Sequence, residues 1–352
     1  MTVTVSIVVP TYRRDGLLRR CLDALRAQHL ASGVRDAPQH ARSPTATPGT
    51  PLSAAVLSRA EVEVIVVDDG RSAATRLLVE SLAAEHPVPR LRYLQPPCGA
   101  RGPAAARNAG WRAAEGEVIA FTDDDTVPAR DWLAAGMRAM ASADVAAAWG
   151  RVKVPMPPQP SDWERNVARL DGAEFLTANL FVRRGVLAAV GGFDERFKRA
   201  WREDSDLWFT LIERGGRIVH APDAVVLHPV RTARWGVSLD LQKNMLFDAL
   251  LYKKHPRLYR CQIAGRPPLR YYFVVAALAI ALAGAALGWE RAAAVAGAVW
   301  LAFTLGLAAR RLYGTRKTLA HVAEMIVTSA AIPPLAVFWR LAGALRFRVL
   351  FA

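Results

Sequence analysis

Residues 118–125 read Val-Ile-Ala-Phe-Thr-Asp-Asp-Asp, a short apolar run that leads almost directly into three carboxylates. An apolar run of this length with polar boundaries is typical of a strand buried on both faces. Three adjacent carboxylates repel one another unless a cation compensates for their charge, and hard oxygen ligands suit Mg²⁺ or Mn²⁺ bound beside phosphate oxygens. The stretch therefore predicts a divalent-metal site at a strand end; the alternative is a solvated acidic turn.

The sequence on either side alternates strands and helices. Further strands are predicted over 3–9, 62–67 and 91–94, with helices over 15–29, 72–85 and 103–114 between them. This alternation predicts an α/β domain with a mostly parallel sheet and right-handed crossovers. Beyond residue 155 the pattern is weaker, with a strand expected over 177–182, a helix over 203–214 and a last strand over 225–227.

Composition narrows the class of protein. The chain has 352 residues, a formal net charge of +15 and three cysteines without a Cys-x-x-Cys pair, which excludes a disulfide scaffold and a thiolate zinc site. The Pro-rich stretch 31–58 is predicted to be a surface insertion, mostly disordered. Residues 1–10 lack a basic start and a cleavage site, so we expect no signal peptide.

Two uncharged stretches, 271–289 and 292–309, are long enough to span a membrane. Arginines and Lys317 flank them, which favours anionic lipid over nucleic acid as a partner and places the N-terminal domain in the cytosol at the inner membrane. A third apolar run is cut by Pro333-Pro334, so 319–352 is expected to be interfacial or re-entrant. The predicted domains are therefore 1–235, a connecting helical segment 236–268 and a multi-pass membrane region 269–352.

Two more pairs of acidic residues lie where a predicted strand ends and where a predicted helix begins. Asp68-Asp69 follows a predicted strand, where a carboxylate can accept hydrogen bonds from a ribose or a base, although Asp69-Gly70 is also ordinary turn chemistry. Glu203-Asp204 opens a predicted helix, whose dipole favours ionised carboxylates. That placement suits a general base whose pKa is not much raised; the alternative is simple helix capping.

Together these residues resemble the family 2 glycosyltransferases, which have the GT-A fold. The resemblance covers roughly residues 3–228. It rests on Val9-Pro10-Thr11-Tyr12, Val67-Asp68-Asp69-Gly70, Gly102 with Ala106-Arg107-Asn108, Thr122-Asp123-Asp124-Asp125, Gly191-Gly192-Phe193-Asp194 and Glu203-Asp204. Arg13 and Arg71 depart from the family pattern, in which Asn and Ser are usual.

The resemblance implies a role for each matching residue. Donor-nucleotide contacts are implied for Pro10, Thr11, Tyr12, Asp69, Arg107, Asp123 and Asp124. The Asp-x-Asp pattern implies that Asp125, with Asp123, holds Mg²⁺ or Mn²⁺ on the diphosphate, and a late histidine such as His228 can complete the metal shell. Asp204 is the implied catalytic base, with Glu203 near the acceptor.

The implied reaction is inverting transfer of a sugar from a UDP- or GDP-sugar to a hydroxyl of a lipid or lipid-linked glycan, as in cell-envelope polysaccharide synthesis. Arg231-Thr-Ala-Arg234-Trp235 is similar to the Gln-x-x-Arg-Trp motif of processive members, in which the Trp contacts the acceptor. Because Arg231 replaces the Gln and only two clear spans are present, we expect a non-processive enzyme, with Trp235 as an acceptor or membrane contact. The alternatives are a polyprenyl-phosphate glycosyltransferase, a processive synthase, or an inactive sensor or scaffold.

Overall fold

The structure is a computed structural model that describes residues 4–29 and 61–351. The predicted insertion at 31–58 lies outside the described residues. The chain forms two compact units, the first made of Met1–Pro155 with Arg169–Pro229 and the second of Met156–Ala168 with Val230–Ala352. The short segment Met156–Ala168 therefore belongs with the C-terminal part of the chain.

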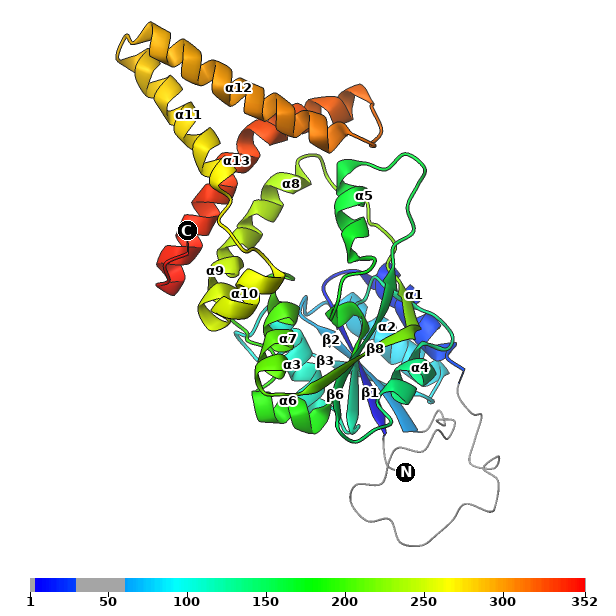
Figure 1. Cartoon of the computed structure of the whole chain (residues 1–352). Coiled ribbons are helices and arrows are strands. Elements are labelled where there is room, and N and C mark those ends of the chain that lie inside the picture. The colour runs from blue at the N-terminus through cyan, green and yellow to red at the C-terminus, as the bar shows by residue number, and fades with distance from the viewer. Residues whose placement is uncertain (1–3, 30–60, 352) are drawn as a thin grey trace, which may run out of the picture. The chain divides into compact units, whose positions relative to one another are not determined.

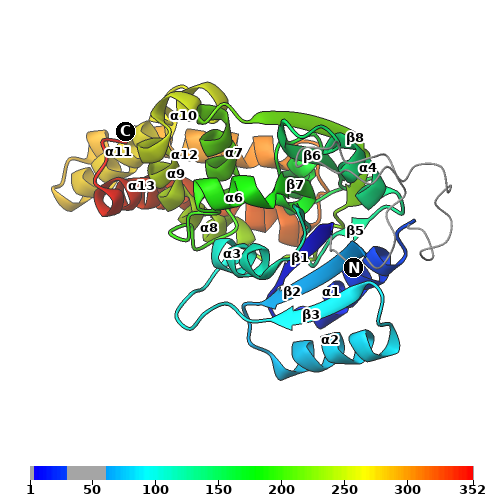
Figure 2. The ribbon, with the colours of Figure 1, turned by 90° about the horizontal axis from the view of Figure 1, so that it is seen from below.

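The first unit is built on an eight-stranded sheet, counted over the described residues, with the order β3-β2-β1-β4-β7-β6-β8-β5 (Figures 1 and 2). The strands are β1 (Val5–Thr11), β2 (Val62–Asp68), β3 (Arg90–Leu94), β4 (Val118–Phe121), β5 (Val127–Pro128), β6 (Val145–Lys153), β7 (Leu180–Arg183) and β8 (Arg217–Leu227). Strands β3, β2, β1 and β4 are parallel neighbours, whereas β7 runs antiparallel to both β4 and β6. The predicted mostly parallel α/β sheet is confirmed.

Helices connect the strands of this sheet. They are α1 (Asp15–Arg26), α2 (Ala73–Glu85), α3 (Pro103–Ala113), α4 (Trp132–Ala139), α6 (Arg184–Val190) and α7 (Glu203–Glu213). Figure 2 shows α2 lying along β3. Pro103 occupies the first turn of α3 as expected, since the missing N–H needs no partner there.

Two parts of the sheet differ from the sequence-based expectation. The range 177–182 begins as a short 3₁₀ turn (Thr177–Asn179), and only then continues as β7. Strand β6 was not predicted, because its stretch 146–148 is all alanine, a residue with low strand propensity. Pairing with β7 on one side and β8 on the other makes it a strand.

Helix α3 packs closely on β1 at Gly110. A Cβ atom at this position would lie 2.3 Å from Cγ1 of Val8 and 3.0 Å from Cγ2 of Val67. Both valines belong to the buried core of the first unit. The glycine therefore sets the distance between the helix and the strands whose ends carry the acidic residues described below.

The second unit is helical over its described residues. Its elements are α5 (Asp162–Val167), α8 (Val237–Asp240), the 3₁₀ turn η4 (Leu241–Asn244), α9 (Met245–Lys254), α10 (Pro256–Gln262), α11 (Leu269–Ala286), α12 (Glu290–Leu312) and α13 (Leu319–Phe347). Helices α11 and α12 form a hairpin (yellow and orange in Figure 1). Helix α13 packs on α9, where a Cβ at Gly343 would meet the carbonyl oxygen of Leu246 at 2.5 Å.

Helix α13 overturns the expectation that Pro333-Pro334 cuts the third apolar run. The helix continues through both prolines for 29 residues. Long apolar helices tolerate proline because neighbouring groups satisfy the freed backbone carbonyls. By length and composition α11, α12 and α13 are each able to cross a membrane, so the described chain holds three such helices rather than two.

We predict that Gly110→Ala destabilises the first unit. The added methyl group has no room beside Val8, and overpacking of this kind costs about 1–3 kcal/mol. Thermal unfolding of the purified chain measures the effect. Gly185→Ala is the matched control, since this α6 glycine has nothing within 4 Å of its Cβ position and the alanine is expected to leave stability unchanged or raise it slightly. Equal unfolding midpoints for the two variants would contradict the close packing of α3 on β1.

Candidate active site

The carboxyl ends of three parallel strands meet at one edge of the sheet, as the sequence predicts. Thr11, the last residue of β1, stands in register with Asp68, the last residue of β2. On the other side of β1, Val8 is in register with Phe121, the last residue of β4. The acidic segment Asp123–Asp125 therefore follows β4 at the same edge as Thr11 and Asp68. In open α/β sheets this edge is where ligands bind.

Asp124 joins the ends of β4 and β1. Its carboxylate accepts a hydrogen bond of 2.7 Å from the Thr11 hydroxyl and one of 2.9 Å from the Arg14 guanidinium. Burial raises the pKa of Asp124 to about 6, although Arg14 and Thr11 act in the opposite direction. The side chains of Thr11 and Asp124, both predicted to contact the donor, are thus bonded to each other and hold the strand ends together.

Asp68 and Asp69 have different surroundings and different partners. Asp68 is fully buried and accepts bonds from the backbone N–H groups of Gly70 and Ser72 and from the Tyr93 hydroxyl. Asp69 is half-buried and accepts a bond of 3.0 Å from the N–H of Gly102. Asp69 therefore anchors the start of α3 at the strand-end site.

Arg107 is the centre of the site. Its side chain is 3% exposed, and it donates one bond of 2.8 Å to Asp123 and another of 3.0 Å to Glu203. Asp123 follows β4, whereas Glu203 begins α7, so one guanidinium connects two acidic clusters that lie far apart in the sequence. The structure brings together Arg107, Asp123 and Glu203, three residues that the sequence analysis singled out separately.

The acids at the start of α7 differ from the sequence-based expectation. Burial and the neighbouring Asp204 raise the pKa of Glu203 to about 7, against the attraction of Arg107. Burial also raises the pKa of Asp204, while the backbone N–H of Ser205, which donates a 2.6 Å bond, and the charge of Arg202 oppose that change. The expectation that the helix dipole keeps these pKa values near normal is wrong, because burial outweighs the dipole here.

Asn108 was part of a quoted motif but was given no role, and the structure gives it one. Its amide group donates to the carbonyl of Phe193 and accepts from the N–H of the same residue, at 2.8 and 2.9 Å. The indole N–H of Trp111 also donates to it. Asn108 thereby fixes the loop that contains Gly191-Gly192, and the polar residue inside an alanine-rich helix was the available signal.

Asp125 and its neighbours can supply only part of the coordination shell of a metal ion, and a bound substrate would have to supply the rest. The Asp125 Oδ1 atom lies 3.5 Å from Nε2 of His228, and both side chains are largely buried. The buried Nδ1 atom of His228 has no hydrogen-bond partner within the described ranges. Over residues 4–29 and 61–351 no group of three or more His, Cys, Asp or Glu residues is arranged to hold a metal ion by itself. A hard cation here fits only if other oxygens, such as those of a phosphate, complete its shell.

Arg14 is a site residue that the sequence analysis missed. Its guanidinium lies 2.9 Å from Asp124 and 3.6 Å from the second oxygen of Asp125, and about a third of its side chain is exposed. It therefore offsets part of the repulsion within the acidic segment. The only signal in the sequence was a second arginine after Tyr12.

The remaining predicted contacts lie at the surface. Pro10 is half-buried, and Tyr12 is 52% exposed with the Arg13 guanidinium 5.7 Å from its ring centre. Trp235, predicted to contact an acceptor, is 54% exposed and belongs to the second unit.

The chain was compared with known proteins. Residues 6–189 match the family model described as glycosyl transferase family 2. The chain is 32% identical over 197 residues to the pre-mycofactocin glycosyltransferase of Mycobacterium tuberculosis, covering 50% of this chain and 39% of that protein. It is 23% identical over 240 residues to the glycosyltransferase AglE of Haloferax volcanii, covering 64% and 67% of the two chains. The chain thus spans about two fifths of the length of the first of these relatives.

Among solved structures, the chain is similar to the mannosyltransferase PcManGT from Pyrobaculum calidifontis, determined in complex with GDP-Man and Mn²⁺. The two share 22% identity with a TM-score of 0.54, over 97% of this chain and 88% of that one. This similarity supports the fold, including the helical part that follows the sheet.

We predict that Arg107→Gln destabilises the first unit by about 3–5 kcal/mol, because it leaves the buried Glu203 carboxylate without its cation. Unfolding in denaturant measures the loss. The control is Arg112→Gln on the same helix, whose 3.4 Å pair with Glu195 is exposed and contributes less than about 1 kcal/mol. Adding Glu203→Gln to the Arg107 variant is expected to recover part of the stability. A loss no larger than that of the control would mean that the buried pair is not formed.

Proposed function

The chain belongs to glycosyltransferase family 2, and from this we propose that it transfers a sugar from a nucleoside-diphosphate sugar to a hydroxyl group of a lipid or lipid-linked glycan. One observation carries the proposal: Arg107 connects Asp123 at the end of β4 with Glu203 at the start of α7. Donor-side acids and acceptor-side acids thus belong to one buried cluster. A transfer reaction requires both substrates to meet at such a place.

The donor is held by the strand ends. The surface that Pro10 and Tyr12 form at the end of β1 receives the base, and Asp69 accepts hydrogen bonds from the base or ribose. Asp123, which is partly exposed, faces the ribose or the sugar. UDP and GDP donors share the diphosphate that this site requires; the mannosyltransferase of similar fold was solved with GDP-Man, which makes a GDP-sugar a suitable first probe.

Asp125, with His228 and Asp123, would hold Mg²⁺ or Mn²⁺, and the bound ion would neutralise the charge of the departing diphosphate. The side chains present support this assignment. Nε2 of His228 and Oδ1 of Asp125 lie 3.5 Å apart, and an ion bound by these two atoms keeps coordination positions for phosphate oxygens. Arg14 adds a fixed positive charge on the same side.

Asp204 acts as the general base. It is only partly buried, whereas Glu203 is 4% exposed and bonded to Arg107, so Asp204 is the carboxylate of the pair that a substrate reaches. It accepts the proton of the acceptor hydroxyl while that oxygen attacks the anomeric carbon. Its raised pKa makes this carboxylate a stronger base than an ordinary aspartate. A single displacement inverts the anomeric centre.

The acceptor is lipidic. Three helices that are able to cross a membrane follow the catalytic unit, with arginines at their ends. Attachment to the membrane raises the effective concentration of a membrane-bound acceptor around the site. The positive flanks support a catalytic unit on the cytosolic face of the inner membrane. A single transfer is supported by Arg231, which stands where processive members have Gln.

We predict that Asp125→Ala abolishes Mn²⁺-dependent binding of the donor, because the metal loses its principal carboxylate. Titration of GDP- and UDP-sugars with and without Mn²⁺ measures the affinity. Asp131→Ala is the control, since that exposed carboxylate pairs only with His29 among the described contacts. Unchanged Mn²⁺-dependent affinity in the Asp125 variant would remove the metal assignment.

We predict that Asp204→Asn lowers turnover by about 10²–10⁴-fold while donor affinity is retained, because the amide cannot accept a proton but keeps the size of the side chain. Sugar transfer from the bound donor to membrane-extracted lipid acceptors gives the rate. Asp206 is a poor control because it is 2% exposed, so its substitution is expected to disturb the packing of α7 as well. Glu213→Gln at the exposed end of the same helix is the better one. Full activity in the Asp204 variant would leave the mechanism without its base, and transfer to a lipid phosphate instead of a hydroxyl would identify the polyprenyl-phosphate alternative.

A further inference from the structure

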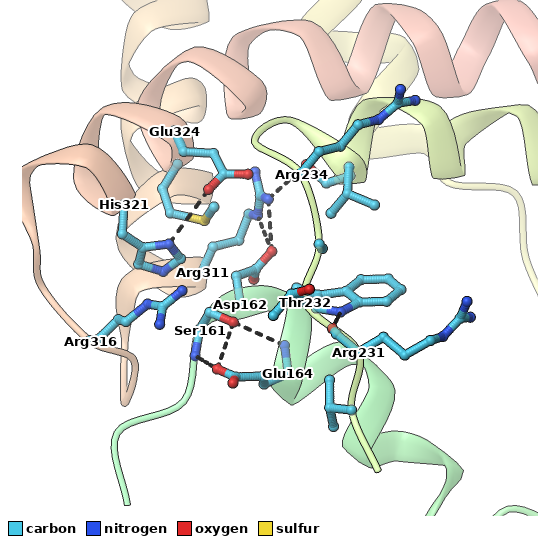
Figure 3. Close-up of a pocket in the computed structure, with 16 residues that line it drawn as sticks. Ser161, Asp162, Glu164, Arg231, Thr232, Arg234, Arg311, Arg316, His321 and Glu324 are labelled. Carbon is cyan, nitrogen blue, oxygen red and sulfur yellow. Dashed lines mark hydrogen bonds and ion pairs between the residues drawn. The ribbon is translucent and has the colours of Figure 1, made fainter. Parts of the chain in front are cut away.

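The second unit contains a polar cavity of about 200 Å³ (Figure 3). Its wall is formed by α5, the segment 230–238, the last turn of α12, the α12–α13 connection at Arg316 and the first two turns of α13. All of these segments belong to the same unit. The volume lies below the range of about 300–1,000 Å³ that is usual for drug-sized ligands, so the cavity fits a small polar group rather than a nucleotide sugar.

The acids in the wall are already bonded within the protein. Asp162 accepts a bond of 2.7 Å from Arg311, and Glu324 accepts one of 2.7 Å from the N–H of Gly236. Glu164 forms a capping box with Ser161 at the start of α5. Burial tends to raise the pKa of Glu164, but the Ser161 hydrogen bonds and the charge of Arg316 bring the net value below normal. The acids therefore organise the wall, and the ligand that the remaining cations of the lining attract is an anion.

One cation at the cavity is well placed for such a ligand. Arg316 and Arg234 both line the cavity and are solvent-exposed, but Figure 3 shows the Arg316 side chain beside His321 and the Arg234 guanidinium pointing away from both. By contrast, Arg311 is engaged, since it also donates to Thr328, Ser329 and Ser238. Guanidinium groups bind phosphate oxygens with two parallel hydrogen bonds, which makes a phosphate group the matching anion.

His321 supplies the independent observation. Its side chain is 4% exposed and lines the cavity in the first turn of α13, with Nδ1 3.8 Å from Glu324. Its Nε2 atom is buried and has no hydrogen-bond partner among the described residues. Buried polar atoms are rarely left unpaired, so this nitrogen points to a ligand that the cavity receives.

The cavity lies next to a basic segment that connects two apolar helices, and this position indicates where a phosphate group would come from. The connection between α12 and α13 joins two helices that are long and apolar enough to cross a membrane. It carries Arg316 and Lys317, and Arg310 and Arg311 end α12. Such a basic cluster next to apolar helices is attracted to anionic lipid headgroups.

We propose that this cavity is a binding site for a phosphate group, contacted by Arg316 and His321, next to the α12–α13 connection. A phospholipid headgroup and free phosphate share this chemistry. The site belongs to the second unit, and its existence does not depend on the transferase activity proposed for the first.

The test uses the full chain in a neutral maltoside detergent. Dihexanoyl phosphatidic acid, inorganic phosphate and dihexanoylglycerol, which has no phosphate, are titrated separately, and the thermal-unfolding midpoint gives each affinity. The variant Arg316→Gln removes the cavity charge beside His321. The matched control, Lys317→Gln, removes one charge at the neighbouring position, outside the cavity wall. Binding of the sugar donor with Mn²⁺ is measured on every variant to report on the first unit separately.

We expect the phosphate-bearing probes to stabilise the parent and the control, and the cavity variant to bind them about tenfold more weakly or worse, as for loss of charge-assisted bonds. Tighter binding of phosphatidic acid than of phosphate assigns the site to a lipid headgroup, and equal affinity assigns it to free phosphate. The proposal is overturned if neither phosphate probe binds, if dihexanoylglycerol binds as well as phosphatidic acid, or if the Arg316 and Lys317 variants lose the same affinity.

Discussion

The ion pairs of Arg107 are the interaction on which the first unit's site depends. A guanidinium that is 3% exposed can remain in the protein only with its charge compensated, and Asp123 and Glu203 supply that compensation from two different elements. The end of β4, the middle of α3 and the start of α7 are thereby held at fixed positions relative to one another. The close approach of α3 to β1 at Gly110 brings Arg107 to this place.

The three aspartates after β4 are adjacent and chemically identical, but packing gives each of them a different partner. Asp123 pairs with Arg107, Asp124 is buried against Thr11 and Arg14, and Asp125 lies next to His228. Asp124 and Asp125 lie in a turn that the N–H of Thr126 closes on the carbonyl of Asp123, so the three carboxylates point in different directions and each meets a different neighbour. Repulsion within the triplet is reduced because arginines reach it from two sides.

Much of the fold follows from local sequence. The apolar runs that become β1, β2 and β4, the Pro103 helix start and the two uncharged stretches were each identified from a few neighbouring residues. The failures are also local in origin: alanines concealed β6, and Pro333-Pro334 gave the appearance of a break within α13. In both cases the partners that decide the outcome are distant in the sequence, namely β7 and β8 for the strand and the packed helices α9, α11 and α12 for the helix.

The sequence by itself determined where the strands end and hence that Asp69, Asp123 and Asp125 share one edge of the sheet, because strand period and apolar length are properties of neighbouring residues. Only the tertiary structure decided which charge meets which. Arg107 and Glu203 are 96 positions apart, and Thr11 and Asp124 are 113 apart. Burial, which raises the pKa values of Glu203 and Asp204, is likewise a property of the packed molecule, since water is excluded only when distant elements close around a side chain.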